Sequence, residues 1–287
     1  MIAVTGATGT VGRELVRLLV ERGERPRVIT RDATAARLLL GDGVDYAQAD
    51  LDRPETLRSA LAGADQLFVL TPPTSRQPDR ERHLVTAAVA AGVGHVVKTS
   101  VFRADPVSRL RLARQHGRIE AAIARTPARW TFLRPTFFMQ NLTGQALNGV
   151  LVGATRAGRV GMVDARDVAA AAAAALTVPV TGNRIHTLTG PRTLRLSQAA
   201  DIISVAGGIR CGHREVAPRQ VRAAMLHSGA EAWFATDMAR LHTMLAGGYE
   251  DLVTPDLDEL TGRPGRDLSD FAEDLLATPA VPAPAPV

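Results

Sequence analysis

A glycine-rich turn close to the amino terminus constrains the fold of this chain more than any other segment. The turn, Gly6-Ala7-Thr8-Gly9-Thr10-Val11-Gly12, follows an apolar run from Ile2 to Thr5 and opens an amphipathic segment from Val11 to Arg22. Gly6 permits a tight exit from a strand, Gly9 lets the backbone approach a ligand, and Gly12 lets a helix lie close to the sheet. The turn therefore predicts a strand, a ligand-binding turn and a helix in that order.

The same turn indicates the kind of ligand. A helix that begins near Val11 presents open amide groups and the positive end of its dipole, which suits the pyrophosphate of a dinucleotide. Thr8 and Thr10 add two hydroxyls toward the same oxygens. We therefore assign six residues to cofactor binding: Gly6, Thr8, Gly9, Thr10, Val11 and Gly12.

Short apolar runs alternate with amphipathic segments over the first 135 residues, which is typical of parallel strands joined by helices. The expected strands are Ile2 to Thr5, Arg27 to Thr30, Val44 to Ala47, Gln66 to Leu70, His95 to Thr99 and Trp130 to Arg134. The expected helices are Val11 to Arg22, Thr34 to Leu40, Pro54 to Ala62, Arg80 to Ala91 and Leu110 to Ala124. Right-handed connections place the carboxyl ends of these strands on one edge, where a ligand binds.

Beyond Pro135 the alternation is less regular. One more helix, Val168 to Leu176, and one more strand, Arg184 to Thr189, are expected before a region without a strong strand. The helices expected in that region are Leu196 to Ala206, Pro218 to His227, Glu231 to Ala246 and Leu268 to Leu276.

These elements predict an α/β fold with two domains. A Rossmann-type doubly wound parallel sheet spans residues 1–190, of which 140–162 can contribute to the second domain. A smaller, mostly helical carboxyl-terminal lobe over residues 191–276 binds the substrate. The proline- and alanine-rich residues 277–287 lack amide donors and are expected to be a disordered tail.

The composition excludes several classes of function. The single cysteine, Cys211, rules out an internal disulfide and a multi-cysteine metal site, and the histidines lack ligand spacing. No apolar run reaches the about 18 residues of a membrane helix, and the apolar start is too short for a signal peptide, so we expect a cytoplasmic protein. The net charge of +5 comes with dispersed arginines and 4% aromatic residues, which disfavours nucleic-acid binding. We expect a monomer or homodimer whose partner is a small molecule.

Several segments resemble one protein family. The spacing G-x-x-G-x-x-G resembles that of extended and atypical short-chain dehydrogenases/reductases. Trp130-Thr131-Phe132-Leu133-Arg134-Pro135 and Phe137-Phe138-Met139-Gln140-Asn141 resemble the "WTxLRPxxFMxN" segment of the NmrA-like branch. Asp164-Ala165-Arg166-Asp167-Val168 and Leu260-Thr261-Gly262-Arg263-Pro264 resemble later landmarks of that branch. Together they cover most of the chain, and they imply an NAD(P)H-binding reductase of quinones or ketones.

The resemblance also implies roles for individual residues. Asp50 and Leu51 resemble an adenine-binding pair, and Thr71-Pro72-Pro73 resembles a loop beside the nicotinamide. Thr99, Pro135 and Phe138 are further cofactor candidates, and the substrate candidates are Phe137, Met139, Asn141, Trp233 and Phe234. Trp233 and Phe234 lie on a helix that can act as a lid over the substrate. The alternative for these apolar side chains is ordinary packing.

The end of the second strand decides between NADPH and NADH. An acid there holds the ribose hydroxyls of NADH, whereas an arginine suits the 2′-phosphate of NADPH. This chain has both, Arg31 and Asp32. We favour NADPH, because Arg31 comes first after the strand and because the NmrA-like branch often carries an arginine there. Arg13 can assist, and the alternative for Arg31 is a solvated surface side chain.

The usual proton donor of the wider superfamily is missing. Most members use a tyrosine with a lysine four residues later, but neither Tyr46 nor Tyr249 is followed by a lysine at that distance. Glu120 resembles the family's glutamate after this pair. Counting back from it puts His116 at the lysine position and Leu112 at the tyrosine position. The usual mechanism is therefore excluded.

Three residues are candidates for handling the proton instead: Ser100, Lys98 and His116. Ser100 ends the fifth strand, where the superfamily places its active-site serine, and either donates to a substrate carbonyl or caps the next loop. Lys98, the chain's only lysine, points either toward the cofactor or away from it. His116 contacts the nicotinamide ribose, relays a proton or lies on the helix surface.

We predict an NADPH-dependent reductase that transfers a hydride to a ketone or quinone of a hydrophobic, polycyclic aromatic, polyketide-like molecule, as in antibiotic biosynthesis. Such substrates delocalise or internally hydrogen-bond the charge that develops on oxygen, so substrate-assisted protonation can replace a protein acid. The alternative is an NmrA-like regulatory protein that senses NADP(H) without turnover. An isomerase or epimerase is disfavoured, because such enzymes usually need the absent tyrosine.

Overall fold

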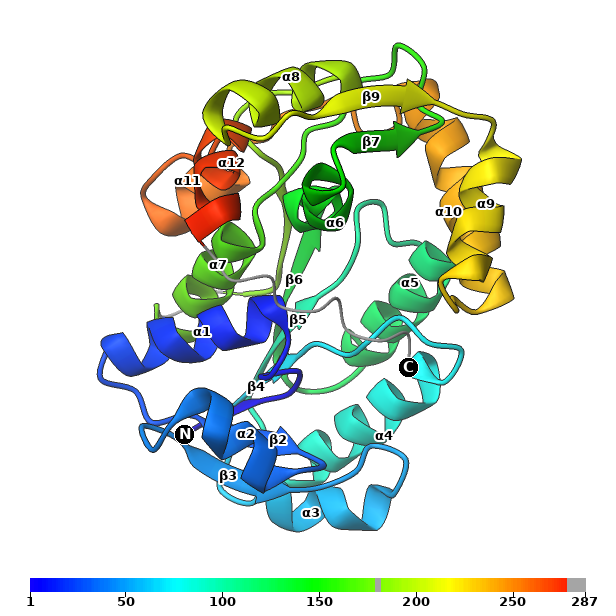
Figure 1. Ribbon diagram of the computed structural model, residues 1–287. Coiled ribbons are helices and arrows are strands. Elements are labelled where there is room, and N and C mark those ends of the chain that lie inside the picture. Colours follow the sequence, from blue (N-terminus) through cyan, green and yellow to red (C-terminus); the bar gives the residue numbers. More distant parts are fainter. Residues whose placement is uncertain (179–181, 278–287) are drawn as a thin grey trace. The chain divides into compact units, whose positions relative to one another are not determined.

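The computed structural model describes residues 1–178 and 182–277, which divide into two compact units (Figure 1). The first unit comprises Met1–Arg109, Ala113–Arg134 and Arg166–Thr187, and the second comprises Leu110–Leu112, Pro135–Ala165 and the described residues from Leu188 onward. The domain division at residue 190, with residues 140–162 contributing to the second domain, stays a prediction; in the structure the chain leaves the first unit at Pro135 and returns to it at Arg166. Of the expected tail, residue 277 ends a helix, and residues 278–287 lie outside the described residues.

The first unit is built on a seven-stranded sheet in the order β3-β2-β1-β4-β5-β6-β8. The strands are β1 (Ile2–Val4), β2 (Arg27–Thr30), β3 (Asp45–Gln48), β4 (Gln66–Val69), β5 (His95–Thr99), β6 (Arg129–Pro135) and β8 (Arg184–Leu188). Neighbours from β3 to β6 pair in parallel; Val4, for example, is in register with Val28 and Phe68. The predicted Rossmann-type sheet is confirmed, and each strand ends within one residue of its predicted bounds.

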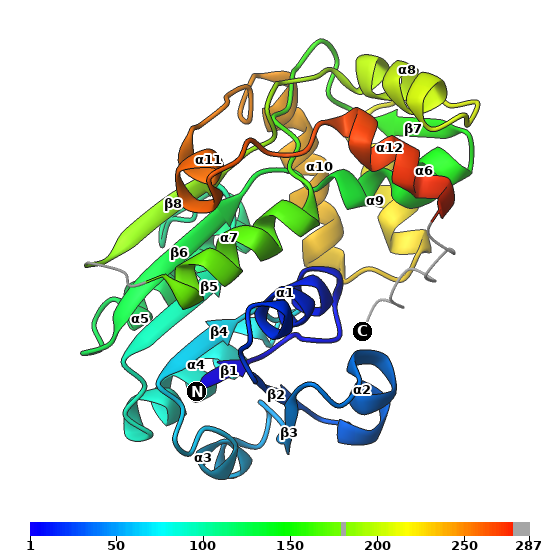
Figure 2. The same ribbon diagram turned by 90° about the vertical axis from the view of Figure 1, so that its left-hand side faces the viewer.

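Burial explains why these short runs become strands. Leu67, Phe68 and Val69 of β4 have no exposed surface, and all five residues of β5 are buried. A strand with apolar residues on both faces is stable only when helices cover both sides of the sheet. In Figures 1 and 2, α1 (Thr10–Glu21) and α7 (Ala165–Thr177) lie on one side, and α4 (Gln77–Ala90) and α5 (Arg111–Ile123) lie on the other.

Three helices of the first unit differ from their predictions, and one of them, α7, begins three residues before the predicted Val168. The segment expected as one helix over Pro54 to Ala62 is a 3₁₀ turn, η1 (Pro54–Thr56), followed by the single turn α3 (Leu57–Ala60). The Thr56 hydroxyl bonds to backbone carbonyls of the preceding loop, and such bonds compete with a regular helix. Helix α4 begins at Gln77, earlier than predicted, because Pro78 is well suited to the first turn of a helix. The remaining helix, α2 (Ala33–Leu40), agrees with its prediction.

The second unit is mostly helical but contains a small sheet. Its elements are η2 (Met139–Leu142), α6 (Thr143–Leu147), β7 (Val150–Gly153), α8 (Leu196–Ala206), β9 (Gly212–Glu215), α9 (Pro218–His227), α10 (Ala232–Ala246), α11 (Asp256–Thr261) and α12 (Leu268–Ala277). Strands β7 and β9 pair in parallel. The expectation of no strong strand after Leu194 missed β9, because the polar sequence of β9 has no apolar alternation and becomes a strand only by pairing with β7. The hydrophobic core of the second unit includes Leu142, Leu151, Ile203 and Phe271.

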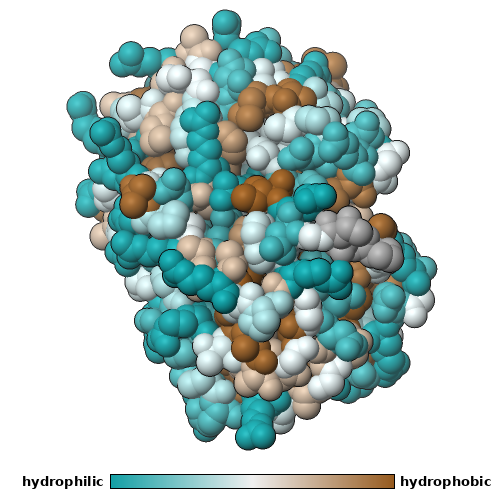
Figure 3. Space-filling view, turned by 180° about the vertical axis from the view of Figure 1, so that it is seen from behind, coloured by the Kyte–Doolittle hydropathy of each residue, from teal (hydrophilic) through white to brown (hydrophobic). Residues whose placement is uncertain are grey.

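One face of the molecule is mainly polar. On the face shown in Figure 3, hydrophilic residues predominate and hydrophobic residues form small, separate groups. Within residues 1–178 and 182–277, no helix is long and apolar enough to cross a membrane. The same residues contain no group of three or more histidine, cysteine, aspartate or glutamate side chains arranged to hold a metal ion.

Candidate functional site

Two glycines of the turn between β1 and α1 are required by the fold itself. Gly6 has a φ of +67°, and a Cβ atom there would lie 2.6 Å from the carbonyl oxygen of Leu70. A Cβ atom on Gly12 would lie 2.0 Å from the carbonyl oxygen of Gly6. Both positions therefore hold the turn and the start of α1 in place, as the sequence predicts.

Gly9 is not required in the same way, and this distinguishes it as a ligand position. It is the N-cap residue of α1 with φ −82° and ψ 174°, which any residue adopts, and a Cβ atom would meet only the Gly6 carbonyl oxygen at 3.4 Å. No side chain caps α1, so the amides of its first turn are open to a ligand. Thr8, Gly9 and Thr10 are exposed, while Val11 is buried. An exposed turn with open amides and no side chain at Gly9 fits the pyrophosphate of a dinucleotide.

The two charged residues after β2 have different surroundings. Asp32 caps α2, because its Oδ1 accepts a hydrogen bond from the amide of Ala35 at 2.9 Å. Arg31 is exposed and makes no hydrogen bond or ion pair with the described residues. It lies near enough to Asp52 to contribute to the lowered pKa of that carboxyl group, after the larger effect of hydrogen bonds from Arg80. The guanidinium group of Arg31 is therefore free to bind a ligand, whereas the carboxylate of Asp32 caps α2.

The adenine-binding candidates lie in a loop fixed by hydrogen bonds. Asp50 and Leu51, both half-buried, follow β3. Asp50 Oδ1 accepts from the amide of Asp52 at 3.0 Å, and the Leu51 carbonyl lies 2.8 Å from Nδ1 of His83. Arg80 of α4 binds both carboxylate oxygens of Asp52, at 3.0 and 2.8 Å. Arg80 was not among the sequence candidates, and it connects this loop to the helix after β4.

A polar cluster lies buried at the carboxyl ends of β4 and β5, and we define it as Thr71, Gln77, Glu81, Lys98 and His116. The Lys98 ammonium contacts Glu81 Oε2 at 2.5 Å, and neither side chain has exposed surface. Glu81 Oε1 accepts from the Thr71 hydroxyl at 2.5 Å and from Gln77 Nε2 at 3.0 Å. Gln77 Nε2 also lies 3.3 Å from His116 Nε2. Lys98 therefore points to Glu81, and His116 is not the helix-surface residue that was one of its expected alternatives.

Several polar atoms in this region have no hydrogen-bond partner among the described residues. They are Thr99 Oγ1, Ser100 Oγ, His116 Nδ1 and Gln77 Oε1, all buried. The Ser100 amide donates to the Leu133 carbonyl at 2.7 Å, which anchors the residue after β5 while leaving its hydroxyl free. A buried polar atom without a partner costs about 1–3 kcal/mol, so these four atoms are available to hydrogen-bond with a water molecule or a ligand.

Burial also sets the protonation state of His116. Removal from water lowers the pKa of His116 well below its ordinary value, and the nearby Lys98 ammonium lowers it further. The ring is therefore neutral at physiological pH, with one nitrogen as donor and the other as acceptor.

The remaining cofactor candidates of the first unit are less informative. Thr71 is buried and uses its hydroxyl within the polar cluster, so its side chain binds Glu81. Pro72 and Pro73 are exposed.

A glutamine and a glutamate four residues apart on α4 complete the polar cluster, and sequence reasoning missed both. Their i, i+4 spacing on one helix face was the only available signal.

The candidates of the second unit lie in two places. Pro135 and Met139 are buried, the latter within the core of the unit, while Phe137 and Phe138 are half-buried and Asn141 is exposed. Trp233 and Phe234 on α10 contact each other edge to face, with ring centres 5.5 Å apart. The guanidinium of Arg111 lies 4.6 Å from the Trp233 ring centre. Met139 is therefore a packing residue, and the half-buried aromatic rings remain candidates for the substrate.

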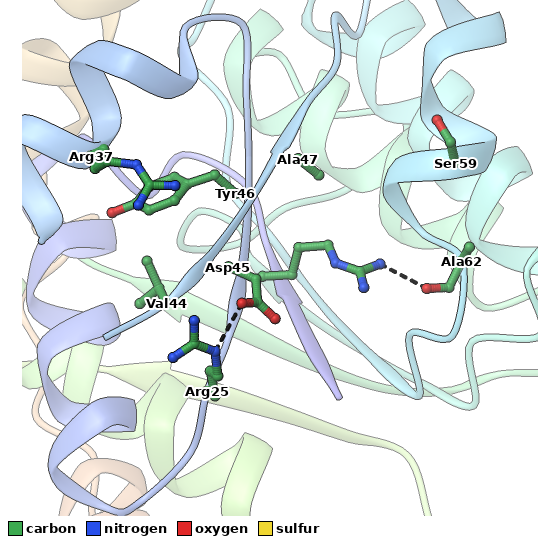
Figure 4. A pocket seen from close by; sticks show the side chains of 9 residues that line it. Arg25, Arg37, Val44, Asp45, Tyr46, Ala47, Ser59 and Ala62 are labelled. Atoms are coloured by element: carbon green, nitrogen blue, oxygen red, sulfur yellow. Dashed lines mark hydrogen bonds and ion pairs between the residues drawn. The ribbon is translucent and has the colours of Figure 1, made fainter. Parts of the chain in front are cut away.

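A pocket of about 540 Å³ lies elsewhere, at the edge formed by β2 and β3 (Figure 4). It is lined partly by arginines, but Arg25 binds Asp45 at 2.8 Å and Arg27 binds the Ala62 carbonyl at 2.7 Å. Arg27 and Asp45 begin their strands, whereas the glycine turn follows the end of β1. Tyr46, one of the chain's two tyrosines, lines this pocket and is therefore no proton donor at the carboxyl ends of the strands.

Comparison with known proteins gives consistent similarities over nearly the whole chain. A model of the NmrA-like family matches residues 1–241. The chain is 37% identical over 277 residues to an NAD(P)H azoreductase of Xenophilus azovorans, covering 95% of this chain and 97% of that protein. It is 35% identical over 285 residues to the (4-alkanoyl-5-oxo-2,5-dihydrofuran-3-yl)methyl phosphate reductase of Streptomyces griseus subsp. griseus, covering 96% and 97%.

Solved structures show the same similarity. An NADPH-dependent quinone oxidoreductase from Escherichia coli, in complex with NADPH, superposes with a TM-score of 0.86 at 27% sequence identity. The superposition covers 96% of this chain and 100% of that chain.

Proposed function

The chain belongs to the NmrA-like family, and from this premise we propose that it is an NADPH-dependent oxidoreductase that reduces a quinone or ketone carbonyl of a small molecule. The similar proteins named above reduce azo compounds, a dihydrofuranone phosphate and quinones, the last with NADPH. The observation in this chain that supports the proposal best is Gly9. The fold does not require a glycine there, since a Cβ atom would meet only the Gly6 carbonyl oxygen at 3.4 Å, yet the residue is exposed at the open start of α1.

Different residues of this chain bind the cofactor and contact the substrate in such a reaction. The amides at the start of α1 bind the pyrophosphate, and Arg31 binds the 2′-phosphate that distinguishes NADPH from NADH. NADPH, when bound, supplies the hydride. The Ser100 hydroxyl is the candidate to donate a hydrogen bond to the carbonyl oxygen, where negative charge develops.

The narrower proposal concerns the substrate, which we infer to be a hydrophobic, polycyclic aromatic quinone or ketone of the polyketide type. The chain lacks the tyrosine and lysine pair that protonates ordinary ketones. A quinone that accepts a hydride and one proton becomes a hydroquinone, and the charge on its oxygen is delocalised over the ring. The reaction therefore needs only a hydrogen-bond donor and a proton from water.

The experiment that tests this function follows the near-ultraviolet absorbance of NADPH in the presence of simple quinones, polycyclic aromatic quinones and ketones, and azo dyes. We expect saturable turnover with quinones that is faster for polycyclic ones. Turnover of azo dyes alone would overturn the carbonyl substrate but not the reductase.

The missing tyrosine also favours a second candidate function, a regulatory protein that senses NADP(H) without turnover. Tight binding of NADP⁺ and NADPH, with no NADPH oxidation by any compound of the panel, would support the sensor and overturn the reductase.

A further inference from the structure

The polar cluster contains a chain of hydrogen bonds that ends at His116 and has no part in the function described so far. Its first link is the pair of Lys98 and Glu81, 2.5 Å apart and without exposed surface. A fully buried ion pair is costly to desolvate and adds little to stability compared with apolar packing. Its presence at the carboxyl ends of β4 and β5 therefore calls for a role other than stability.

The Glu81 carboxylate determines how the Gln77 amide is oriented. A carboxylate only accepts hydrogen bonds, so the atom of Gln77 that lies 3.0 Å from Glu81 Oε1 is the NH₂ nitrogen and not the oxygen. The reverse orientation would place the Gln77 oxygen against a negatively charged oxygen. The buried charge of Glu81 thus fixes the amide in one orientation.

The Gln77 amide in turn determines the tautomer of His116. The same NH₂ nitrogen lies 3.3 Å from His116 Nε2, and its second hydrogen can point to that atom. Nε2 must then be the acceptor, and the single proton of the neutral ring is on Nδ1. Nδ1 is buried and has no partner among the described residues.

We propose that Lys98, Glu81 and Gln77 are positioning residues that hold His116 in the Nδ1–H tautomer, so that His116 donates a hydrogen bond to an oxygen of the bound NADPH or of the substrate. The second half of this proposal rests on the proposed function, whereas the tautomer does not. A ribose hydroxyl and a carbonyl oxygen are both acceptors that suit this donor. His116 thus acts as a neutral donor in place of the lysine cation that the wider superfamily carries at this position.

The tautomer can be measured directly by ¹⁵N NMR of protein labelled at histidine, because protonated and unprotonated ring nitrogens have widely separated shifts. The chain has seven histidines, and the His116→Asn variant assigns the signals of His116 by their loss. We expect a protonated Nδ1 and an unprotonated Nε2 in the free protein. A protonated Nε2 would overturn the proposal, whatever the outcome of the turnover assays.

Variants test the links made by Gln77 and Glu81. Gln77→Leu removes the donor to Nε2 but keeps the ion pair of Glu81 and Lys98, so the protein is expected to fold and the His116 ring to lose its single tautomer. Glu81→Gln replaces the carboxylate that orients the Gln77 amide with a neutral group, and it is expected to cause a partial loss of the single His116 tautomer. Gln115→Leu replaces a buried glutamine of α5 outside the polar cluster and leaves the tautomer unchanged. An unchanged tautomer in Gln77→Leu would overturn the positioning role.

Ligand titrations identify the acceptor. If the acceptor is a ribose hydroxyl, NADP⁺ alone shifts the Nδ1–H signal; if it is the carbonyl, the shift requires NADP⁺ together with a quinone. Loss of this hydrogen bond in Gln77→Leu is expected to lower kcat/KM about five- to tenfold. Binding of both ligands with no shift of the signal would overturn the donor role and leave the reductase intact.

Discussion

Asp32 Oδ1 accepts a hydrogen bond from the amide of Ala35 at 2.9 Å, so the acid at the end of β2 caps α2. One oxygen of that carboxylate is already bound within the protein, whereas Arg31 makes no hydrogen bond or ion pair with the described residues, so we predict that Arg31 decides between the two coenzymes. This favours the 2′-phosphate of NADPH over the ribose hydroxyls of NADH.

Arg31→Ala is expected to weaken NADPH binding about 10- to 100-fold, since one charge-assisted contact is worth roughly 1.5–3 kcal/mol, and to leave NADH binding unchanged. Fluorescence titration of both reduced coenzymes measures the two affinities. The control, Asp32→Ala, is expected to lower the free energy of unfolding by about 1 kcal/mol through loss of the cap and to leave the coenzyme preference unchanged. Equal losses for both coenzymes in Arg31→Ala would remove this residue from its role.

Gly9→Ala and Gly12→Ala form a matched pair that separates ligand binding from folding. A Cβ atom at Gly9 meets the Gly6 carbonyl oxygen at 3.4 Å, whereas one at Gly12 would lie 2.0 Å from it. Gly9→Ala is therefore expected to keep its Tm within a few degrees and to bind NADPH at least about tenfold more weakly. Gly12→Ala is expected to lose stability as well, by more than about 2 kcal/mol.

Thermal unfolding and coenzyme titration of both variants give the two readouts. If Gly9→Ala bound NADPH as tightly as the parent protein, the phosphate site would lie elsewhere.

Ser100→Ala tests the free hydroxyl after β5. The Ser100 Oγ atom is buried and has no partner among the described residues, so its removal is not expected to lower the free energy of unfolding. If it donates to the developing negative charge of the substrate, kcat falls about 10- to 100-fold while the Kd for NADPH is unchanged. Steady-state kinetics measures this, with Ser59→Ala on the exposed side of α3 as control. An unaltered kcat would mean that Ser100 only fills space.

The sheet was predictable because its signals are local. Runs such as Gln66 to Leu70 are apolar at nearly every position and are bounded by turn residues, and the glycine turn follows a strand and precedes a helix. The open start of α1 also follows from local sequence. Strand β9 was not predictable, because Gly-His-Arg-Glu has no periodicity and depends on a partner more than 50 residues earlier in the chain.

The polar cluster was predictable only in part, for the same reason. Lys98 and His116 were candidates because of their positions at a strand end and on a helix, but the direction of the Lys98 side chain depends on a glutamate of another element. Glu81 lies in the middle of a helix rich in charged residues, where a solvated side chain is the usual expectation. Its burial follows from packing between α4 and β5, which no local pattern contains.

The buried side chain of His95 is expected to make the free energy of unfolding depend on pH. This first residue of β5 is buried, with its ring nitrogens 3.1 Å from Gln66 Oε1 and 3.0 Å from Thr131 Oγ1. Burial lowers the pKa of His95 to about 4, and the nearby Arg129 contributes to the lowering. The unfolded chain, with a histidine pKa of about 6.5, therefore binds a proton that the folded chain does not in the range between these values. The contribution of His95 to the free energy of unfolding is therefore fully present above about pH 6.5 and is lost as the pH decreases toward about 4.

The variant His95→Gln cannot take up this proton and is expected to flatten the decline between pH 6.5 and 4, measured as the free energy of unfolding in urea at several pH values. Its stability at pH 7 is expected to fall by about 1 kcal/mol, since glutamine replaces the ring imperfectly. Burial also lowers the pKa of His116 and His242, so the slope is reduced and not abolished. Carboxyl groups with lowered pKa, such as Asp52, titrate below this range. A slope as steep in the variant as in the parent protein would show that the decline originates elsewhere.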